Sequence, residues 1–277
     1  MTVRRLLALF LLPVLLLAAA CGGGDDDEAT DTDEPSDEPV EPVEPLRILV
    51  TNDDGVGGEG IAALVEGLEG LDDVEVTVVA PAENQSGTGG QTSPTPPAAE
   101  EAELVDGSPA IAVAGFPADS VVHGLENVLE EPPHLVISGI NEGQNLGPIA
   151  ANVSGTVGAA LRAADEGVPA LAVSQGLAEE LDYPVAVELA LEWVEEHREA
   201  LLAGDVGTDE IANLNVPSCA TGEIRGVIEV PTAADSTGRD PIGAPADCAS
   251  TAADPADDIA AYLTGYAPLA PVPVAAP

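Results

Sequence analysis

From residue 46 onward, short apolar runs alternate with stretches of helical periodicity, and this alternation limits the chain to few folds. The runs at 46–52, 74–81 and 134–141 are rich in Val, Leu and Ile and predict buried strands. The other segments predicted in this way are the strands 110–115, 169–175, 211–217 and 224–230 and the helices 60–71, 117–129, 155–167 and 184–202. Strands separated by helices join through right-handed crossovers, which favours a mostly parallel sheet covered by helices on both faces. We therefore expect an α/β domain.

The charge of the chain excludes one class of partner. Its 277 residues include 50 Asp and Glu against seven basic residues, all of them Arg, and the formal net charge is −43 at pH 7. Such a surface repels nucleic-acid backbones, so we expect no nucleic-acid partner. Adaptation to salty surroundings or a compositional bias is the simplest interpretation, because net charge informs solubility rather than fold.

The first 20 residues have the pattern of a secretory signal. Arg4 and Arg5 precede an apolar run from Leu6, and small residues lead to Cys21. A cysteine directly after "LAAA" resembles the bacterial lipobox, in which the cysteine is lipidated and becomes the mature N-terminus. A transmembrane anchor is the alternative, but the apolar run is short for one. The sequence therefore predicts a lipoprotein-type signal peptide over 1–20 and an exported protein, anchored to the membrane through Cys21 on the extracytoplasmic side.

The next segment, residues 21–45, differs in composition from the rest of the chain. It contains eleven acidic residues, no basic residue and four prolines. No set of apolar side chains is present that could pack, so we predict a disordered, self-repelling tether. The folded domain is then expected over 46–277.

Two cysteines, Cys219 and Cys248, remain once Cys21 is assigned. In an exported protein such a pair favours a disulfide, and two buried free thiols are the alternative. His123, His134 and His197 are scattered along the chain, and no Cys or His spacing indicates a zinc site.

Three polar loops directly follow predicted strands. Asp53 and Asp54 follow the first strand, Ser86 lies in the loop after the second, and Asn141 ends the strand at 134–141. In parallel sheets ligands gather at the carboxyl ends of the strands, so these loops can converge on one crevice. Carboxylate and neutral oxygens are the ligands that Mg²⁺ and Mn²⁺ prefer. Taken alone, "NDDG" also fits a turn capped by Asp at the start of a helix.

A second polar stretch, "GINEGQNLG" at 139–147, combines glycines with hydrogen-bonding amides. Its glycines permit positive φ or the close approach of a ligand, and Asn145 can both donate and accept hydrogen bonds. Ser154, Gly155 and Thr156 then begin a predicted helix, whose N-terminus can bind an anion. A flexible surface loop and an ordinary N-cap are the alternatives for these two features.

Taken together, "NDDGV", "NQSG", "SGINEGQNLG" and "SGTVGAA" resemble the motifs of the SurE family, the survival-protein 5′-nucleotidases. The resemblance begins near residue 46, includes "GFPADSVVHGL" and "PHLVISGIN", and continues more loosely through "NLNVP" to "GYAPLAP". It implies a Rossmann-like α/β fold with a C-terminal extension. It also implies homodimers or homotetramers with exchanged C-terminal elements.

The same resemblance implies a metal-dependent 5′-nucleotidase, a phosphomonoesterase that converts nucleoside 5′-monophosphates to nucleoside and phosphate. The metal ligands of the family correspond to Asp53, Asp54, Ser86 and Asn141, which would hold one Mg²⁺ or Mn²⁺ ion. Its phosphate region corresponds to Asn145, Ser154, Gly155 and Thr156. The expected catalytic residues are Asp53, Asp54 and Asn145.

Two stretches depart from the family pattern. Gly57, Gly58 and Glu59 stand where the family has bulkier or different residues beside the site, which could alter the base that is accepted. Residues after 232 are rich in Ala, Pro and Asp and have little periodicity. We expect them to form either an extension that wraps a neighbouring subunit or a loop.

Two other functions remain open on the sequence. A lipid-anchored protein could bind a nucleotide or a metal in the same crevice without hydrolysis, although retention of all four metal donors argues against this. A structural surface protein is the third possibility, and it predicts that Asp53→Asn leaves function unchanged.

Overall fold

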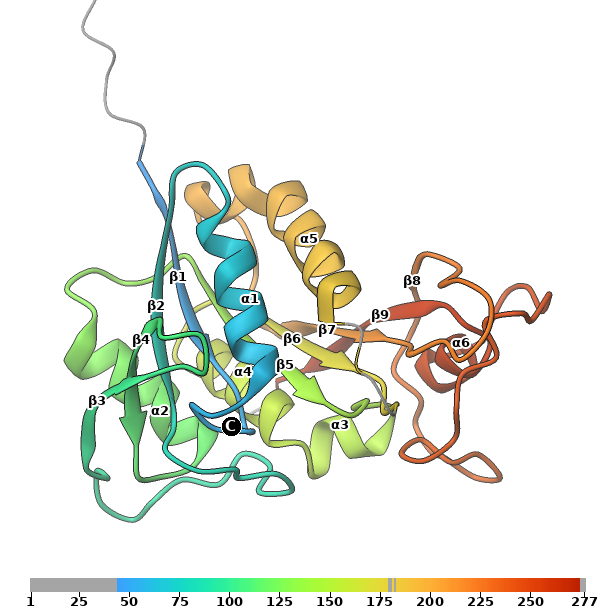
Figure 1. The fold of residues 1–277 in the computed structure, drawn as a ribbon, viewed down its shortest axis with the longest axis horizontal. Coiled ribbons are helices and arrows are strands. Elements are labelled where there is room, and N and C mark those ends of the chain that lie inside the picture. The colour runs from blue at the N-terminus through green and yellow to red at the C-terminus, as the bar shows by residue number, and fades with distance from the viewer. Residues whose placement is uncertain (1–43, 179–180, 182, 275–277) are drawn as a thin grey trace, which may run out of the picture. The chain divides into compact units, whose positions relative to one another are not determined.

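The described part of the chain, residues 44–178, 181 and 183–274 of the computed structural model, contains a sheet of nine strands. The strands are β1 (Leu46–Thr51), β2 (Val74–Pro81), β3 (Ala99–Glu103), β4 (Pro109–Val113), β5 (Leu135–Glu142), β6 (Ala170–Gln175), β7 (Glu210–Val216), β8 (Val227–Glu229) and β9 (Ala267–Pro273). Their order is β3-β4-β2-β1-β5-β6-β7-β9-β8 (Figure 1). Neighbours from β4 to β7 run parallel, whereas β3 is antiparallel to β4 and β9 to β7. The predicted α/β fold with a mostly parallel sheet is confirmed.

Helices cover both faces of this sheet. They are α1 (Glu59–Glu69), α2 (Pro117–His123), the π-helix η1 (Gly124–Val128), α3 (Pro148–Asn152), α4 (Gly155–Asp165), α5 (Tyr183–Ala203) and α6 (Asp258–Leu263). α1 and α5 lie side by side on one face, and α2 and α4 pack together on the other (Figure 1). Strand β1 serves both cores because its side chains alternate: Ile48 and Val50 pack with α1 and α5, and Leu49 packs with α2 and α4.

The strand order places a switch point at β1. The chain runs from β1 to β2 on one side, while β5 pairs with the other side of β1. In open α/β sheets the crevice beyond the carboxyl ends at such a point is the usual ligand site. Asp53 lies in the loop that leaves β1 and Asn141 near the end of β5, so both flank this crevice.

The region from Thr232 onward is more than the loop that was one of its two expectations; an extension that wraps a neighbouring subunit stays a prediction. It contains α6 and β9, and β9 inserts between β7 and β8 of the same chain. Pro268, Pro271 and Pro273 lie within β9. Proline cannot donate to a strand ladder, so these residues argue against a central strand when the sequence is considered alone.

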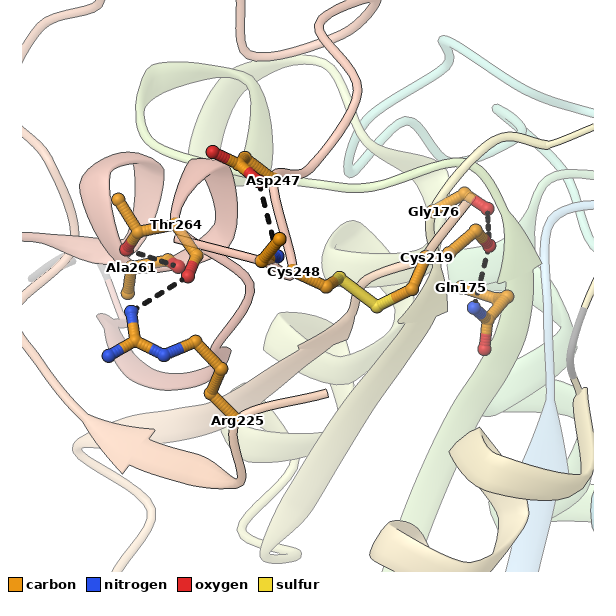
Figure 2. The surroundings of a disulfide bond; sticks show 10 residues. Gln175, Gly176, Cys219, Arg225, Asp247, Cys248, Ala261 and Thr264 are labelled. Atoms are coloured by element: carbon orange, nitrogen blue, oxygen red, sulfur yellow. Dashed lines mark hydrogen bonds between the residues drawn. A yellow bond between two sulfur atoms is a disulfide. The ribbon is translucent and has the colours of Figure 1, made fainter. Parts of the chain in front are cut away.

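A disulfide joins Cys219 to Cys248, with the two Cα atoms 5.8 Å apart (Figure 2). The residue before Cys219, Ser218, donates its hydroxyl to the carbonyl of Gly176 at the end of β6. Cys248 packs against Gly265, directly after α6. Of the two alternatives for these cysteines, a disulfide and two free thiols, the disulfide is present. It ties the segment that leaves β7 to the region of the C-terminal helix α6.

Smaller differences from the predicted elements have local causes. The helix expected over 117–129 is α2 continued by η1, and the strand expected over 224–230 shortens to β8. Strand β3 was not predicted because its sequence, "AEEAE", has little apolar character. It pairs only with β4 at the edge of the sheet, where charged side chains are common in native proteins.

The predicted signal peptide over 1–20, the lipidated Cys21 and the tether up to residue 43 lie outside the described residues. Val43–Pro277 forms one compact unit, and the exact domain boundary stays a prediction. In the described range, none of the helices has the length and apolar character required to cross a bilayer.

Candidate active site

The turn after β1 is closed by the side chain of Asn52. Its Nδ2 donates to the carbonyl oxygen of Gly55 at 2.9 Å, and its Oδ1 accepts from the Gly55 amide at 3.1 Å. Gly55 has φ +88°, a conformation that favours glycine. The sequence "NDDG" is therefore a turn, but Asn52 rather than Asp closes it, and α1 begins only at Glu59 with Gly58 as its N-cap, so the alternative of an Asp cap at a helix start is wrong. The turn fixes where Asp53 and Asp54 emerge.

Asp53 is buried, with 3% of its surface exposed, and it lies against the start of α4. The hydroxyl of Thr156 donates to Asp53 Oδ1 at 2.6 Å. A Cβ added at Gly155 would lie 2.7 Å from the Cβ of Asp53, so only glycine permits this approach. Burial raises the pKa of Asp53, and the hydrogen bond from Thr156 opposes the rise. The ionised carboxylate is therefore costly unless a cation approaches it.

Asp54 points to the other side of the turn. Its Oδ1 accepts from the side chain of Asn84 at 3.0 Å, and its Oδ2 accepts from the amide of Glu142 at 3.1 Å. Burial raises the pKa of Asp54 to about 6, and the charges of Asp53 and Glu142 add to the rise. Asp54 lines a neighbouring cavity of about 630 Å³ together with Glu142 and Tyr183.

A cavity of about 170 Å³ lies at the carboxyl edge of the sheet and gathers most of the predicted site. Five of the predicted residues line it: Asp53, Ser86, Asn141, Asn145 and Ser154. Asp54 opens on the adjoining cavity instead, while Gly155 and Thr156 lie behind Asp53 rather than on the cavity wall. The structure thus brings together three of the four predicted metal donors and two of the four predicted phosphate-binding residues.

The loop that carries Ser86 is held to both β1 and α4. The amide of Gln85 donates to the carbonyl of Asp53 at 2.7 Å, and the amide of Ser86 donates to Asn84 Oδ1 at 2.9 Å. A Cβ at Gly158 would lie 2.3 Å from the carbonyl oxygen of Gly89. Gly158 of α4 therefore permits the close packing of this loop on the helix, with Ser86 and Asp53 on the same cavity.

Asn141 lies where the register of β5 against β6 shifts, next to a cis peptide between Gly139 and Ile140. Its side-chain Nδ2 donates to the carbonyl of Gly143. With Nδ2 engaged in this way, the Oδ1 atom remains to accept from a ligand or to contact a cation.

Asn145 is buried and fixed by the ends of β6 and β7. Its Nδ2 donates to Ser174 Oγ at 2.9 Å, and its amide donates to Asn215 Oδ1 at 2.6 Å. Its carbonyl accepts from the side chains of Asn213 and Asn215 at 2.9 and 3.1 Å. The residue is held on three sides, which suits a group that must hold a fixed position toward a substrate.

Ser154 caps α4, because its Oγ accepts from the amide of Val157 at 3.1 Å. The N-cap alternative therefore describes its geometry. Ser154 also lines the cavity, so the N-terminus of this eleven-residue helix lies beside Asp53. An anion in the cavity would lie near the positive end of the helix dipole.

Sequence reasoning missed several residues of the site. Asn213 and Asn215 alternate along β7, so a period of two places them on one face, and this pattern was the available signal. Gln144 and Ile242 also belong to the cavity wall. Gln144 belongs to the polar stretch 139–147, but nothing in the local sequence of Ile242 indicates its place, because it is 98 residues away and meets Gln144 only in the fold.

The donor set fits a hard divalent cation. Asp53 supplies a carboxylate in a site where burial opposes an unpaired charge, and Ser86 and Asn141 supply neutral oxygens in the same cavity. In the part of the chain that the structure describes, no three His, Cys, Asp or Glu side chains cluster as a metal-binding group. A site here would therefore combine carboxylate with neutral oxygen ligands, as the sequence predicts.

Comparison with known proteins identifies the family. The family model for Survival protein SurE matches residues 48–240. A 5′-nucleotidase SurE from Methanopyrus kandleri is 41% identical over 182 residues, which are 61% of this chain and 66% of the relative. One from Halobacterium salinarum is 43% identical over 188 residues, 64% of this chain and 68% of the relative. The matched segment therefore spans about two thirds of the length of these relatives.

A solved structure supports the same relationship. The crystal structure of SurE protein from Aquifex aeolicus aligns with a TM-score of 0.64 and 30% sequence identity, covering 83% of this chain and 94% of that chain. The resemblance seen in the sequence motifs is thus confirmed both by sequence relatives and by fold. The chain belongs to the SurE family.

Proposed function

We propose that this protein is a metal-dependent phosphomonoesterase that hydrolyses nucleoside 5′-monophosphates to nucleoside and phosphate. The name of its relatives, 5′-nucleotidase SurE, supports the enzyme class. The observation that carries the proposal is the meeting of Asp53, the capped N-terminus of α4 and two neutral oxygen donors around one cavity. Such a site pairs a place for a cation with a place for an anion.

Asp53, Ser86 and Asn141 would hold one divalent ion, Mg²⁺ or Mn²⁺, with Asp54 at the adjoining side of the same turn. The ion, when bound, would polarise the phosphoryl group and make water a better nucleophile at neutral pH. The chain supports this arrangement through Thr156, whose hydroxyl orients the carboxylate of Asp53, and through Asn84, which orients that of Asp54.

The other residues of the cavity would position the phosphate. The backbone amides at the start of α4 favour negative charge, and the amide side chain of Asn145 is held within the same wall. Fixed donors of this kind stabilise charge that develops in the transition state, because they need no reorganisation. Asp54, with its pKa raised to about 6, is placed to exchange a proton near neutral pH.

Removal of divalent metal tests this proposal most directly. The full-length chain, offered a panel of nucleoside 5′-monophosphates, should release phosphate with Mn²⁺ or Mg²⁺ and fall to background in EDTA. Activity should return when excess metal is restored, and the melting temperature in EDTA serves as the control for unfolding. Undiminished release in EDTA would contradict metal dependence. A folded protein that releases no phosphate with any metal would favour the alternative, a nucleotide- or metal-binding protein without hydrolysis.

We also propose that the protein is exported and anchored to the membrane through Cys21, on the strength of the residue pattern at 1–21. Cys21→Ala should remove the lipid anchor, so the expected result is loss of the protein from the membrane fraction or retention of an unprocessed precursor. Ser36→Ala is the control, since it changes a residue after the signal and leaves all three cysteines in place. Unchanged membrane retention of processed Cys21→Ala protein would count against the anchor. Assembly into homodimers or homotetramers stays a prediction from the family resemblance.

A further inference from the structure

Three exposed apolar side chains surround the mouth of the candidate active site. Val153, Leu177 and Ile242 line the same cavity as Asp53, and 46%, 50% and 54% of their surfaces are exposed. The other large apolar residues with comparable exposure in the described ranges are Val105 and Val227. Most such residues therefore gather at one place, and we call these three the apolar rim. Exposed apolar groups that gather beside a polar cavity are typical of a contact surface.

The apolar rim is assembled from separate parts of the chain and held in place by Gln144. The side chain of Gln144 is buried; its Nε2 donates to the carbonyl of Ile242, and its Oε1 accepts from the amide of Leu177 at 3.3 Å. The hydroxyl of Tyr262 also donates to this oxygen at 3.3 Å. One buried amide thus joins two residues of the rim and connects them to α6.

Ile242 belongs to the segment that the disulfide closes. Cys219 and Cys248 bound this segment, and the bond anchors it beside α6 and the end of β6 (Figure 2). The side chain of Ile242 is nonetheless more than half exposed, so it contributes little to the core of the protein. An apolar residue that is held firmly and left facing solvent is available to a ligand.

The size of the cavity indicates what lies against the rim. Its volume of about 170 Å³ is below the ~300–1,000 Å³ of pockets that enclose a drug-sized ligand. The cavity has room for a phosphate near Asp53 and Ser154 but not for a whole nucleotide. The rest of a larger phosphate ester then lies either in the adjoining cavity, which carries the carboxylates of Asp54, Glu59 and Glu142, or at the mouth. The mouth is where the exposed apolar side chains of Val153, Leu177 and Ile242 are. A ligand with one charged end and one flat, weakly polar end matches a polar cavity with an apolar mouth.

We propose that the apolar rim is the contact surface for the nucleoside moiety of the substrate, and that Ile242 sets the preference for nucleoside monophosphates over phosphate esters that lack a base. This inference rests on the proposed function, because it assigns a contact surface to the nucleoside, the part of the substrate that lies outside the phosphate site. A base lying on Ile242 and Leu177 removes apolar surface from water on both partners, and an ester without a base gains nothing there.

The test compares Ile242→Ala with Val105→Ala, an equally exposed apolar residue in the turn between β3 and β4 and remote from the cavity. The full-length protein is assayed with a nucleoside 5′-monophosphate and with ribose 5-phosphate, which has the same phosphate and sugar but no base. For Ile242→Ala we expect KM for the nucleotide to rise by about three- to tenfold with kcat nearly unchanged, and KM for ribose 5-phosphate to stay the same. Val105→Ala should behave as wild type with both substrates.

A binding measurement separates this inference from the proposed function, because it requires no turnover. Equilibrium dialysis with a free nucleoside should show weaker binding to Ile242→Ala than to wild type and Val105→Ala. A wild-type protein that binds the nucleoside through Ile242 but hydrolyses nothing would overturn the proposed function and keep the inference. A wild-type protein that hydrolyses both phosphates, with Ile242→Ala indistinguishable from it in KM and in nucleoside binding, would overturn the inference and keep the function.

Discussion

Asp53→Asn should abolish metal-dependent phosphate release while the protein stays folded, with kcat/KM lower by at least about 10²–10³-fold. Asparagine has nearly the same shape as aspartate, and its Oδ1 can still accept the hydroxyl of Thr156, which now donates at 2.6 Å. The substitution therefore removes one negative charge and little else. That charge lies in the same cavity as Ser86 and Asn141, where it is the strongest of the predicted ligands for a cation.

The same variant should be no less stable than wild type when both are free of metal. Burial raises the folded-state pKa of Asp53 above its ordinary value of 3.8, so the ionised carboxylate destabilises the fold. This cost is absent below pH 3.8, where Asp53 is protonated in both the folded and the unfolded protein. It grows as pH rises from 3.8 through the folded-state pKa, because the unfolded chain loses this proton more easily than the folded protein does. In EDTA, the melting temperature of Asp53→Asn relative to wild type should therefore rise between pH 4 and pH 7.5. Added Mn²⁺ should raise the melting temperature of wild type and leave that of Asp53→Asn unchanged.

Asp72→Asn is the matched control, because Asp72 is exposed in the turn after α1 and lies outside the site. It changes net charge by the same amount, so it accounts for the general effect of one carboxylate in a chain of charge −43. Wild-type activity of folded Asp53→Asn protein supplied with metal would show that Asp53 is not a metal ligand needed for catalysis. Unchanged function in this variant is also what the hypothesis of a purely structural surface protein predicts.

The second large effect is expected for stability at Asp258, which is fully buried at the start of α6. Its carboxylate accepts from three backbone amides: Gly147 at 2.7 Å, Ala233 at 2.9 Å and Ile259 at 2.8 Å. Asp258→Ala would leave these three donors buried without a partner. At about 1–3 kcal/mol for each unsatisfied buried group, the free energy of unfolding should fall by at least about 3–5 kcal/mol.

Asp258→Ala should also impair the site, because Gly147 ends the loop that carries Asn145. The measurements are the denaturant midpoint and kcat/KM of whatever fraction stays folded. Asp257→Ala is the control at the neighbouring position: Asp257 caps α6 and pairs with Arg239 at the surface, so its loss should cost only about 1 kcal/mol. Equal midpoints for the two variants would show that the buried hydrogen bonds of Asp258 contribute little.

Several features of the fold and site follow from the sequence because their causes are local. The runs 46–52 and 134–141 are short and apolar, as buried strands are, and the helical periodicity between strands indicates crossovers, so a mostly parallel sheet is favoured. The place of "NDDG" after the first of these strands and of "SGIN" at the end of the other puts Asp53 and Asn141 at the carboxyl edge. Their distance from each other in the sequence does not matter, since parallel strands bring these ends together.

Other features depend on packing and left no local signal. Strand β9 forms despite three prolines because β7 and β8 offer it a place in the sheet. The hydroxyl of Thr156 faces Asp53, 103 residues away in the chain, rather than the cavity, and only the close approach at Gly155 decides this.

The class of fold, the polar edge and the chemistry of the donors can be deduced from the amino acids alone, because strand period, helix period and side-chain type are properties of a few neighbouring residues. Which of those residues share a cavity, and which apolar side chains surround its mouth, is settled only when the elements pack. Ile242 reaches that mouth through a hydrogen bond from Gln144 across 98 residues, held by a disulfide and by α6. Contacts of this kind depend on how whole elements pack, and no short stretch of the chain encodes them.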